Sequence, residues 1–350
     1  MSGQQFNEWV KQYDGKRRLH DLLSLAMEQG NEVIMIHIVQ AIETKKASSI
    51  WQKLNPWFPA VKYYQLFYWA CLKRSKKILH FLIRDKKIKL NKPLGPEKLT
   101  PLMIAMRYQC DEALTLLLAY PNIDVNAKDK KGMTALMYAI VWQSDCGLSL
   151  MLENEQININ AVDKFGNTAL MLAIKNRAHK EAECMLHHPK INLNVVNKAG
   201  LTPLTQAIVQ QDHHIVHVML SVDDSIIKNK KWWQNPIFMI NSKAVLEVAV
   251  LHHPSLLKEL NEYGDTLLHH YSRLGWIELV AYLLKCKGVD VNVQDQCKRV
   301  PLMLAIQSGH QGMTQLLLSD KRVDLKAIDI NGRSIIHYVE NSSCEVKALF

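Results

Sequence analysis

Residues 99–207 repeat one short pattern four times, and this pattern decides the fold. The copies read LTPLMIA (99–105), MTALMYA (133–139), NTALMLA (167–173) and LTPLTQA (201–207). Threonine is second in each copy, at positions 100, 134, 168 and 202, which gives a spacing of 34 residues every time. A fixed period of this length is typical of repeat architectures, whose units bury their apolar faces by stacking on their neighbours. We therefore expect an array of small units.

The pattern continues on both sides of this stretch. Downstream, DTLLHHY, RVPLMLA and RSIIHYV place Thr266, Val300 and Ser334 in the threonine position, and NPIFMI (235–240) is a degenerate copy. Upstream, weaker copies cover 65–83 and 21–39. About eight to ten units are therefore predicted.

Each unit has the same internal order of signals. It begins with a turn in which Asp or Asn stands three residues before Gly, as in Asp129/Gly132 and Asp329/Gly332. The Asp or Asn side chain can bond to its own backbone, and Gly accepts the positive φ of a tight turn. Pro101 and Pro203 then follow Thr, at the first position of a helix. A polar break and a second apolar stripe complete two antiparallel helices.

This organisation resembles the ankyrin-repeat family, whose unit is a turn plus two helices with a T-P-L-H-x-A signature. The resemblance is strong over 99–220 and 261–333, with the best copy at 300–318. It implies an all-α solenoid of stacked helix-turn-helix units joined by short turns and hairpin loops. The His of the signature is replaced by Met in most copies, so part of the usual turn hydrogen bonding is expected to be missing.

Interruptions in the pattern divide the chain into four segments. We expect an N-terminal helical cap with a Pro- and aromatic-rich insert at 1–62, a repeat block at 63–222, a degenerate repeat or insertion at 223–262, and a C-terminal repeat block with a truncated cap at 263–350.

Composition sets the class of protein. The 350 residues are 48% apolar and 22% charged, which fits a folded chain with a large core. No apolar run is long enough to span a bilayer, and the first residues lack the apolar core of a secretory signal. The seven cysteines are scattered without a CxxC pair, as expected of reduced thiols in a cytoplasmic protein. We expect a monomer without a transmembrane segment.

Sequence motifs give no support to catalysis. No phosphate-binding loop, dinucleotide fingerprint or zinc-protease motif is present. Histidines and a cysteine gather at Cys184, His187, His188 and 213–217, but a metal site needs several ligands converging on one point, and surface histidines are the simpler interpretation. We therefore predict no enzyme activity, cofactor or metal; a Cys/His enzyme site on a repeat scaffold remains an alternative.

Charge is unevenly distributed along the chain. Residues 1–99 hold 18 Lys and Arg against 8 Asp and Glu, whereas residues 100–350 hold 25 of each. Within the basic third, Lys73, Arg74, Lys76 and Lys77 form a patch beside many aromatic residues. Such a patch could bind nucleic acid or an anionic membrane surface, although an enlarged cap with a solvated outer face explains it more simply.

The resemblance also implies where a partner would bind. Ankyrin proteins grip partners on a concave face, with the hairpin tips and the exposed side of the first helix. Carried over position by position, this predicts a partner-binding set of Arg107, Tyr108, Lys130, Lys131, Met133, Val141, Trp142, Lys164, Phe165, Lys175, Lys198, Leu201, Tyr263, Arg273 and Arg299. Aromatic and Arg side chains dominate the energetics of protein interfaces.

The predicted function is therefore a non-enzymatic scaffold that binds another protein. The Lys-, Asn- and Ile-rich style and linkers such as PNIDVNAKD resemble the ankyrin effectors that intracellular bacteria inject into host cells. That resemblance implies a host protein as partner and the host cytosol as destination.

Overall fold

The structure is a computed structural model that describes residues 25–36, 58–84, 88–95, 97–228 and 236–350. Most of the predicted cap at 1–62 and the tract 229–235 lie outside these residues. The described part is helical, and its only β pairings are two isolated bridges, Leu94–Leu99 and Ile328–Ser334. It divides into two compact units, residues 1–172 and 173–350.

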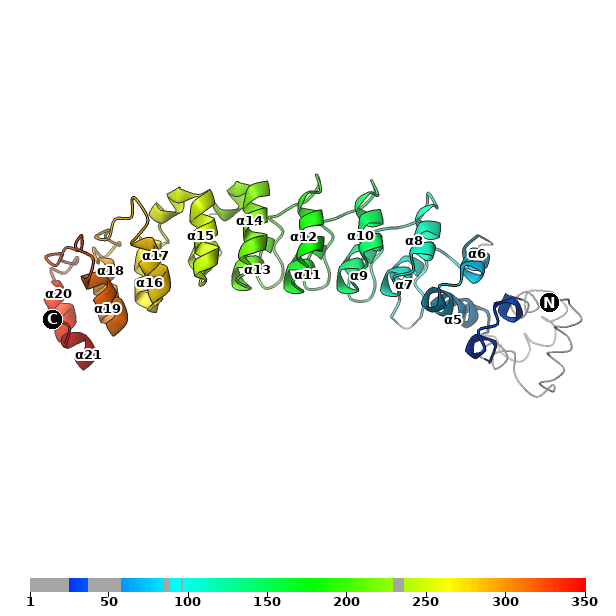
Figure 1. Cartoon of the computed structure of the whole chain (residues 1–350), viewed down its shortest axis with the longest axis horizontal. Helices are drawn as coiled ribbons and strands as arrows, with labels where there is room; N and C mark the ends of the chain where they lie inside the picture. The colour runs from blue at the N-terminus through cyan, green and yellow to red at the C-terminus, as the bar shows by residue number, and fades with distance from the viewer. Residues whose placement is uncertain (1–24, 37–57, 85–87, 96, 229–235) are drawn as a thin grey trace, which may run out of the picture. The chain divides into compact units, whose positions relative to one another are not determined.

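In the described residues of the first unit, three helix pairs follow two short helical segments at 25–28 and 32–36 (Figure 1). These pairs are α5 (Phe58–Lys73) with α6 (Lys76–Arg84), α7 (Pro101–Arg107) with α8 (Asp111–Leu118), and α9 (Ala135–Val141) with α10 (Asp145–Leu152). First helices pack on first helices, as α7 does on α9, and second helices pack on second helices, as α8 does on α10. α11 (Ala169–Lys175) spans the division between the units.

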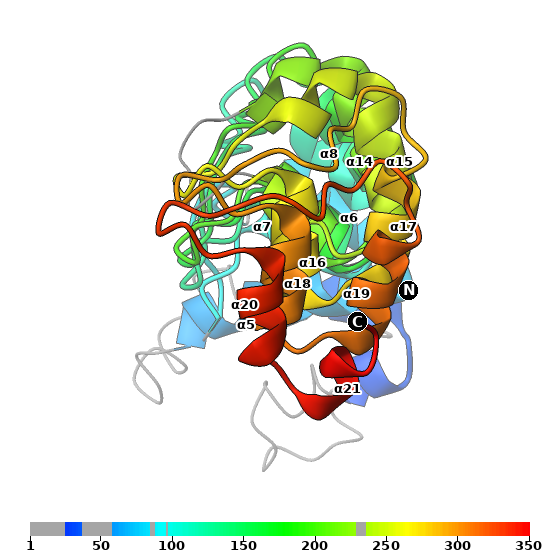
Figure 2. The same cartoon turned by 90° about the vertical axis from the view of Figure 1, so that its left-hand side faces the viewer.

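The second unit continues the same order of elements. It contains α12 (His179–Leu186), α13 (Pro203–Val209), α14 (His213–Val222), η1 (Asp224–Lys228), η3 (Pro236–Met239), α15 (Lys243–His252), η4 (Pro254–Lys258), α16 (Leu267–Leu274), α17 (Ile277–Leu283), α18 (Pro301–Gln307), α19 (Gln311–Leu318), α20 (Ile335–Glu340) and α21 (Cys344–Lys347). Figure 2 shows α16, α18 and α20 in one row and α17 and α19 in another, which agrees with the contacts within each row.

Threonine starts the first helices, as the repeated pattern predicts. The Thr134 Oγ accepts the N–H of Met137, and Thr100 and Thr202 cap α7 and α13 in the same way. Such caps satisfy N–H groups that the helix itself leaves unbonded. The cores then form from the apolar residues that follow, because Leu102, Leu136 and their equivalents are almost fully buried.

The hairpins also form as their sequence predicts. Oδ1 of Asp129 accepts the N–H groups of Lys131 and Met133, both at 2.8 Å, and Gly132 has a φ of +76°. The predicted ankyrin-type helical fold is therefore confirmed in the described residues.

Methionine in the histidine position has a visible consequence. In the repeat that keeps His269, its Nδ1 accepts the N–H of Thr266, while its Nε2 bonds the carbonyl oxygen of Arg299 in the next hairpin at 3.0 Å. This second bond requires that Nε2 carries the proton. A thioether has no such donor, so the repeats with Met lack this link between hairpins.

Candidate functional site

A hollow of about 470 Å³ opens beside the hairpin of the first unit that precedes α9. Its walls come from the segment before α7, the end of α7, the hairpin and α9 itself. The lining side chains are Glu97, Arg107, Asp129, Lys130, Lys131, Met133, Tyr138, Val141 and Trp142. Six of these nine belong to the partner-binding set predicted from the sequence.

Arg107 braces one wall of the hollow. Its Nη1 donates a hydrogen bond to Glu97 Oε2 at 2.6 Å, and its Cζ lies 5.5 Å from the centre of the Trp142 ring. Partial burial works against the guanidinium charge, but Glu97 outweighs burial and raises the pKa of Arg107. The Arg107 guanidinium therefore packs against one face of the Trp142 indole, and Glu97 compensates its charge.

Asp129 and Tyr138 also line the hollow. Besides closing the hairpin with Oδ1, Asp129 accepts a hydrogen bond from the Tyr138 hydroxyl on Oδ2 at 2.8 Å. Burial, together with this bond to a carboxylate, raises the pKa of Tyr138, so the phenol stays neutral and donates. Both oxygens of Asp129 are thus committed to groups of the same repeat.

Apolar side chains remain exposed around this hollow. Val141 and Trp142 each keep 40% of their surface accessible, and Phe165 in the next hairpin keeps 69%. The two hairpins stack, because the N–H of Lys164 donates to the carbonyl oxygen of Lys131 at 3.0 Å. Phe165 therefore stands one hairpin away from the hollow, on the same row of tips.

Tyr108 belongs to a different hollow. It lies edge-on to Tyr68, with ring centres 5.7 Å apart, and lines a hollow of about 620 Å³ together with Tyr64, Trp69 and Leu72. The other predicted residues, Lys175, Lys198, Leu201, Tyr263, Arg273 and Arg299, fall in the second unit. Their role in partner binding stays a prediction.

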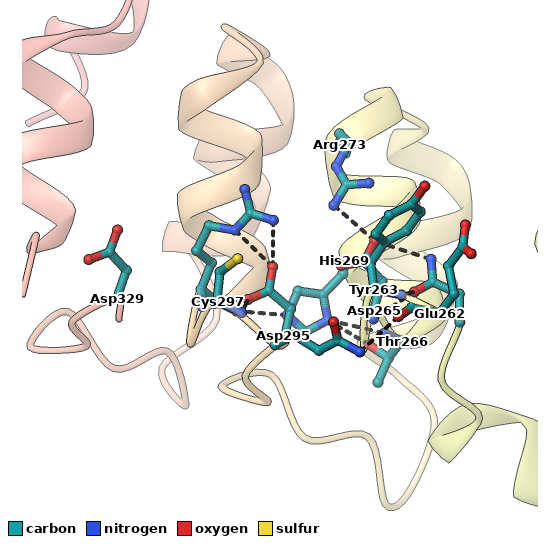
Figure 3. A network of polar contacts seen from close by, with 12 residues as sticks. Glu262, Tyr263, Asp265, Thr266, His269, Arg273, Asp295, Cys297 and Asp329 are labelled. Carbon is teal, nitrogen blue, oxygen red and sulfur yellow. Dashed lines mark hydrogen bonds and ion pairs between the residues drawn. The ribbon is translucent and has the colours of Figure 1, made fainter. Parts of the chain in front are cut away.

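Two of the second-unit arginines have structural partners, and Figure 3 labels one of them, Arg273, beside Asp265. Arg273 pairs with the buried Asp265 at 2.8 Å, and Arg299 pairs with Asp295 at 2.7 Å. The next hairpin repeats the arrangement with Arg333 and Asp329. These pairs fix the bases of successive hairpins, so a partner would meet arginines whose charge is already compensated.

Asp329 shows how strongly these bases are held. Burial opposes its ionisation, but hydrogen bonds from the Arg333 backbone, the Tyr338 hydroxyl and the Arg333 guanidinium outweigh burial and lower its pKa to about 2. Tyr338 and Tyr138 each lie nine residues after the aspartate that they bond. From this shared spacing, the sequence could have identified Tyr138 as a partner of Asp129. The sequence contains no comparable signal for the contact between Glu97 and Arg107.

The predicted basic patch lies at the junction of α5 and α6. Lys73, Arg74, Lys76 and Lys77 are all exposed, and Lys76 pairs with Glu112 at 3.1 Å. The Lys76 bond lowers the pKa of Glu112, and this carboxylate also contacts His80. Nucleic-acid or membrane binding by the patch stays an untested alternative.

The histidine-rich segment forms polar pairs instead of a ligand cluster. His179 bonds Asp212 at 2.7 Å, and His214 bonds Glu183 at 2.5 Å. No group of three or more His, Cys, Asp and Glu side chains in the described residues is placed to hold a metal ion. Cys71 and Cys110 are buried thiols of the first unit, whereas Cys146, Cys184, Cys297 and Cys344 are exposed.

Comparison with known proteins identifies the fold family. A sequence profile described as "Ankyrin repeats (3 copies)" matches residues 66–163, 144–231, 240–329 and 268–346, which is more than half of the chain. The chain belongs to the ankyrin-repeat family. Members of this family bind other proteins, which supports an interaction module in general terms.

The ankyrin repeats are shared with proteins of very different kinds. A rice protein (Oryza sativa subsp. japonica) described as "Probable E3 ubiquitin-protein ligase XBOS33" is 35% identical over 71 residues, 20% of this chain and 14% of that protein. "Neurogenic locus notch homolog protein 1" of Mus musculus is 31% identical over 87 residues, 25% of this chain and 3% of that protein. The chain thus spans a small part of these relatives.

One solved structure is similar to this chain at low sequence identity. The ankyrin repeat domain of Bcl-3, described as a unique member of the IkappaB protein family, gives a TM-score of 0.46 at 19% identity. The similarity covers 72% of this chain and 97% of that one.

In the described residues of this chain, no helix combines the length and the apolar character that crossing a membrane requires.

Proposed function

We propose that the chain is a non-enzymatic interaction module and that it binds a partner protein at the hairpin-tip face of the first unit. This face consists of the Arg107/Trp142 hollow and the neighbouring tip with Phe165. The observation that carries the proposal is the convergence of Arg107, Met133, Val141 and Trp142 on one hollow from two successive repeats. Concave, partly apolar sites with a few fixed polar groups are typical binding sites.

The rigidity of this face supports the same proposal. Glu97 fixes Arg107, Asp129 fixes the hairpin, and the cation over the ring restricts Trp142. A pre-ordered surface loses less conformational entropy when a partner binds, so more of the contact energy is retained as affinity. An exposed aromatic ring held in place is a typical hot spot.

A double substitution tests this face. Trp142→Ala with Phe165→Ala should weaken partner capture at least about tenfold, because hot-spot truncations cost about 2 kcal/mol or more. Phe165 is 69% exposed and Trp142 is 40% exposed, and neither belongs to the buried core, so the melting temperature should change little. Affinity capture by the full chain and thermal unfolding are measured in parallel.

The matched control removes apolar surface elsewhere. Leu251→Ala with Ile277→Ala truncates two exposed side chains of α15 and α17 in the second unit. These variants should capture the partner as the parent chain does. Capture that survives loss of Trp142 and Phe165 would remove this face from consideration.

We further propose that the partner is a host protein and that the module acts in a host cytosol as a bacterial effector. The Lys-, Asn- and Ile-rich style described above supports this proposal. The seven scattered cysteines without a CxxC pair support it too, because they fit a protein that acts in a reducing cytosol. Parallel capture from host and bacterial cytosol tests it: enrichment of one partner from host cytosol is expected, and enrichment from bacterial cytosol alone would contradict it.

A further inference from the structure

The Arg107/Trp142 hollow has apolar side chains in its lining and exposed lysines beside it. Met133, Val141 and Trp142 supply apolar surface, and the exposed Lys131 and Lys164 stand at the two stacked tips beside it. An occupant that satisfies both features needs an apolar side chain for the interior and negative charge beside that side chain.

The acidic side chains of this hollow are already used within the repeat. Glu97 is bonded to Arg107, and Asp129 accepts two backbone N–H groups and the Tyr138 hydroxyl. In contrast, neither Lys131 nor Lys164 has an ion-pair partner in the part of the chain that the structure describes. The charge left for a partner at this rim is therefore positive.

We propose that this hollow binds an acidic segment of the partner protein, with an apolar side chain inserted against Trp142 and flanking Asp or Glu carboxylates at Lys131 and Lys164. The inference rests on the proposed function, because it names the chemistry of the partner at the same face. Charge complementarity of this kind selects partners and accelerates their encounter more than it adds raw affinity.

A peptide segment fits this surface better than a nucleic acid does. A phosphate backbone carries a charge at every nucleotide, and binding it needs basic groups along the whole path. Here Glu97 and Asp129 line the interior, and Arg107 is held by Glu97 and covers the indole. The two tip lysines provide only a short basic stretch, which suits a few carboxylates around one apolar anchor.

A peptide-display selection on the full chain tests the inference. Random peptides of about twelve residues, long enough to cross both tips in an extended conformation, are selected on the parent chain and sequenced. Peptides that combine Asp or Glu with a central aromatic or aliphatic residue should be enriched. The most enriched peptide is then labelled, and its affinity is measured by fluorescence anisotropy.

Charge reversal of the two tip lysines tests whether binding depends on their positive charge. Lys131→Glu with Lys164→Glu should weaken the affinity for the peptide about tenfold or more. Raising the salt concentration from about 50 to 300 mM should weaken this affinity as well. The matched control, Lys321→Glu with Lys326→Glu, makes the same change in net charge on exposed lysines of the second unit and should leave affinity unchanged.

Each contrary result has a distinct meaning. Enriched peptides that are basic or neutral, or an affinity that charge reversal leaves within about twofold, would overturn the acidic partner while leaving the face intact. Displacement of the peptide by a thymidine oligonucleotide of the same length would assign the surface to nucleic acid. If the enriched peptides bind the Trp142→Ala with Phe165→Ala variant with unchanged affinity, that result would instead contradict the proposed face itself.

Discussion

At the residue scale, Gly132 and Gly332 hold the same position in their hairpins but differ in their surroundings. Both have positive φ, at +76° and +73°. A Cβ on Gly132 would lie 2.8 Å from the Lys164 nitrogen and 3.1 Å from the Asp163 carbonyl carbon, whereas a Cβ on Gly332 would meet nothing within 4 Å. The close approach of the stacked hairpins is therefore the second reason for glycine at 132.

The two glycines make a matched pair of substitutions. Gly332→Ala should cost about 1 kcal/mol, the penalty of a left-handed backbone for a residue with Cβ. Gly132→Ala should cost at least about 2 kcal/mol more than that, because backbone of the neighbouring hairpin must shift. Urea unfolding followed by circular dichroism measures both. Equal losses would show that the hairpins are not stacked as described.

At the element scale, equal positions in successive first helices are buried only where another pair follows. Leu302 of α18 is 1% exposed because α20 packs on α18, whereas Ile336 occupies the same position of α20 and is 66% exposed. Leu325 is likewise 55% exposed, although Val125 and Ile159 at its equivalent positions are 1% exposed. Burial in this fold is thus a property of the stack of pairs.

The contrast predicts opposite outcomes for the same kind of truncation. Leu302→Ala should destabilise by about 2 to 5 kcal/mol, through lost burial and the cavity it leaves. Ile336→Ala should change stability by no more than about 0.5 kcal/mol, because its side chain is mostly in water. Thermal unfolding of the two variants tests this. A large loss for Ile336→Ala would mean that a partner surface covers α20 in solution.

At the scale of the whole molecule, the sequence predicts the repeating part of the fold far better than its exceptions. A 34-residue period, Thr caps and Asp–Gly turns are local signals, and each forms as expected, for instance at Thr134 and Asp129. Lys298 is an exception. It stands where the other hairpins have Gly, and it nevertheless takes a φ of +58°, which the pattern alone does not predict for a lysine.

The candidate site was predictable in part of its membership but not in its geometry. Position within the repeat identified six side chains of the hollow, since the fold leaves those positions exposed. The grouping of Arg107 with Glu97 and Trp142 depends on side-chain reach between repeats, which spacing does not specify. Spacing also could not show that Arg273 and Arg299 are tied to buried aspartates.

Site-specific photo-crosslinking tests the central claim, that partners bind at the hairpin-tip face of the first unit. Benzoylphenylalanine is placed at Trp142 in one full-length variant and at Leu251, an exposed residue of α15, in another. Irradiation in host cytosol should give a covalent adduct of one size from position 142 and none from position 251. Adducts of equal yield from both positions, or none from position 142, would contradict the account.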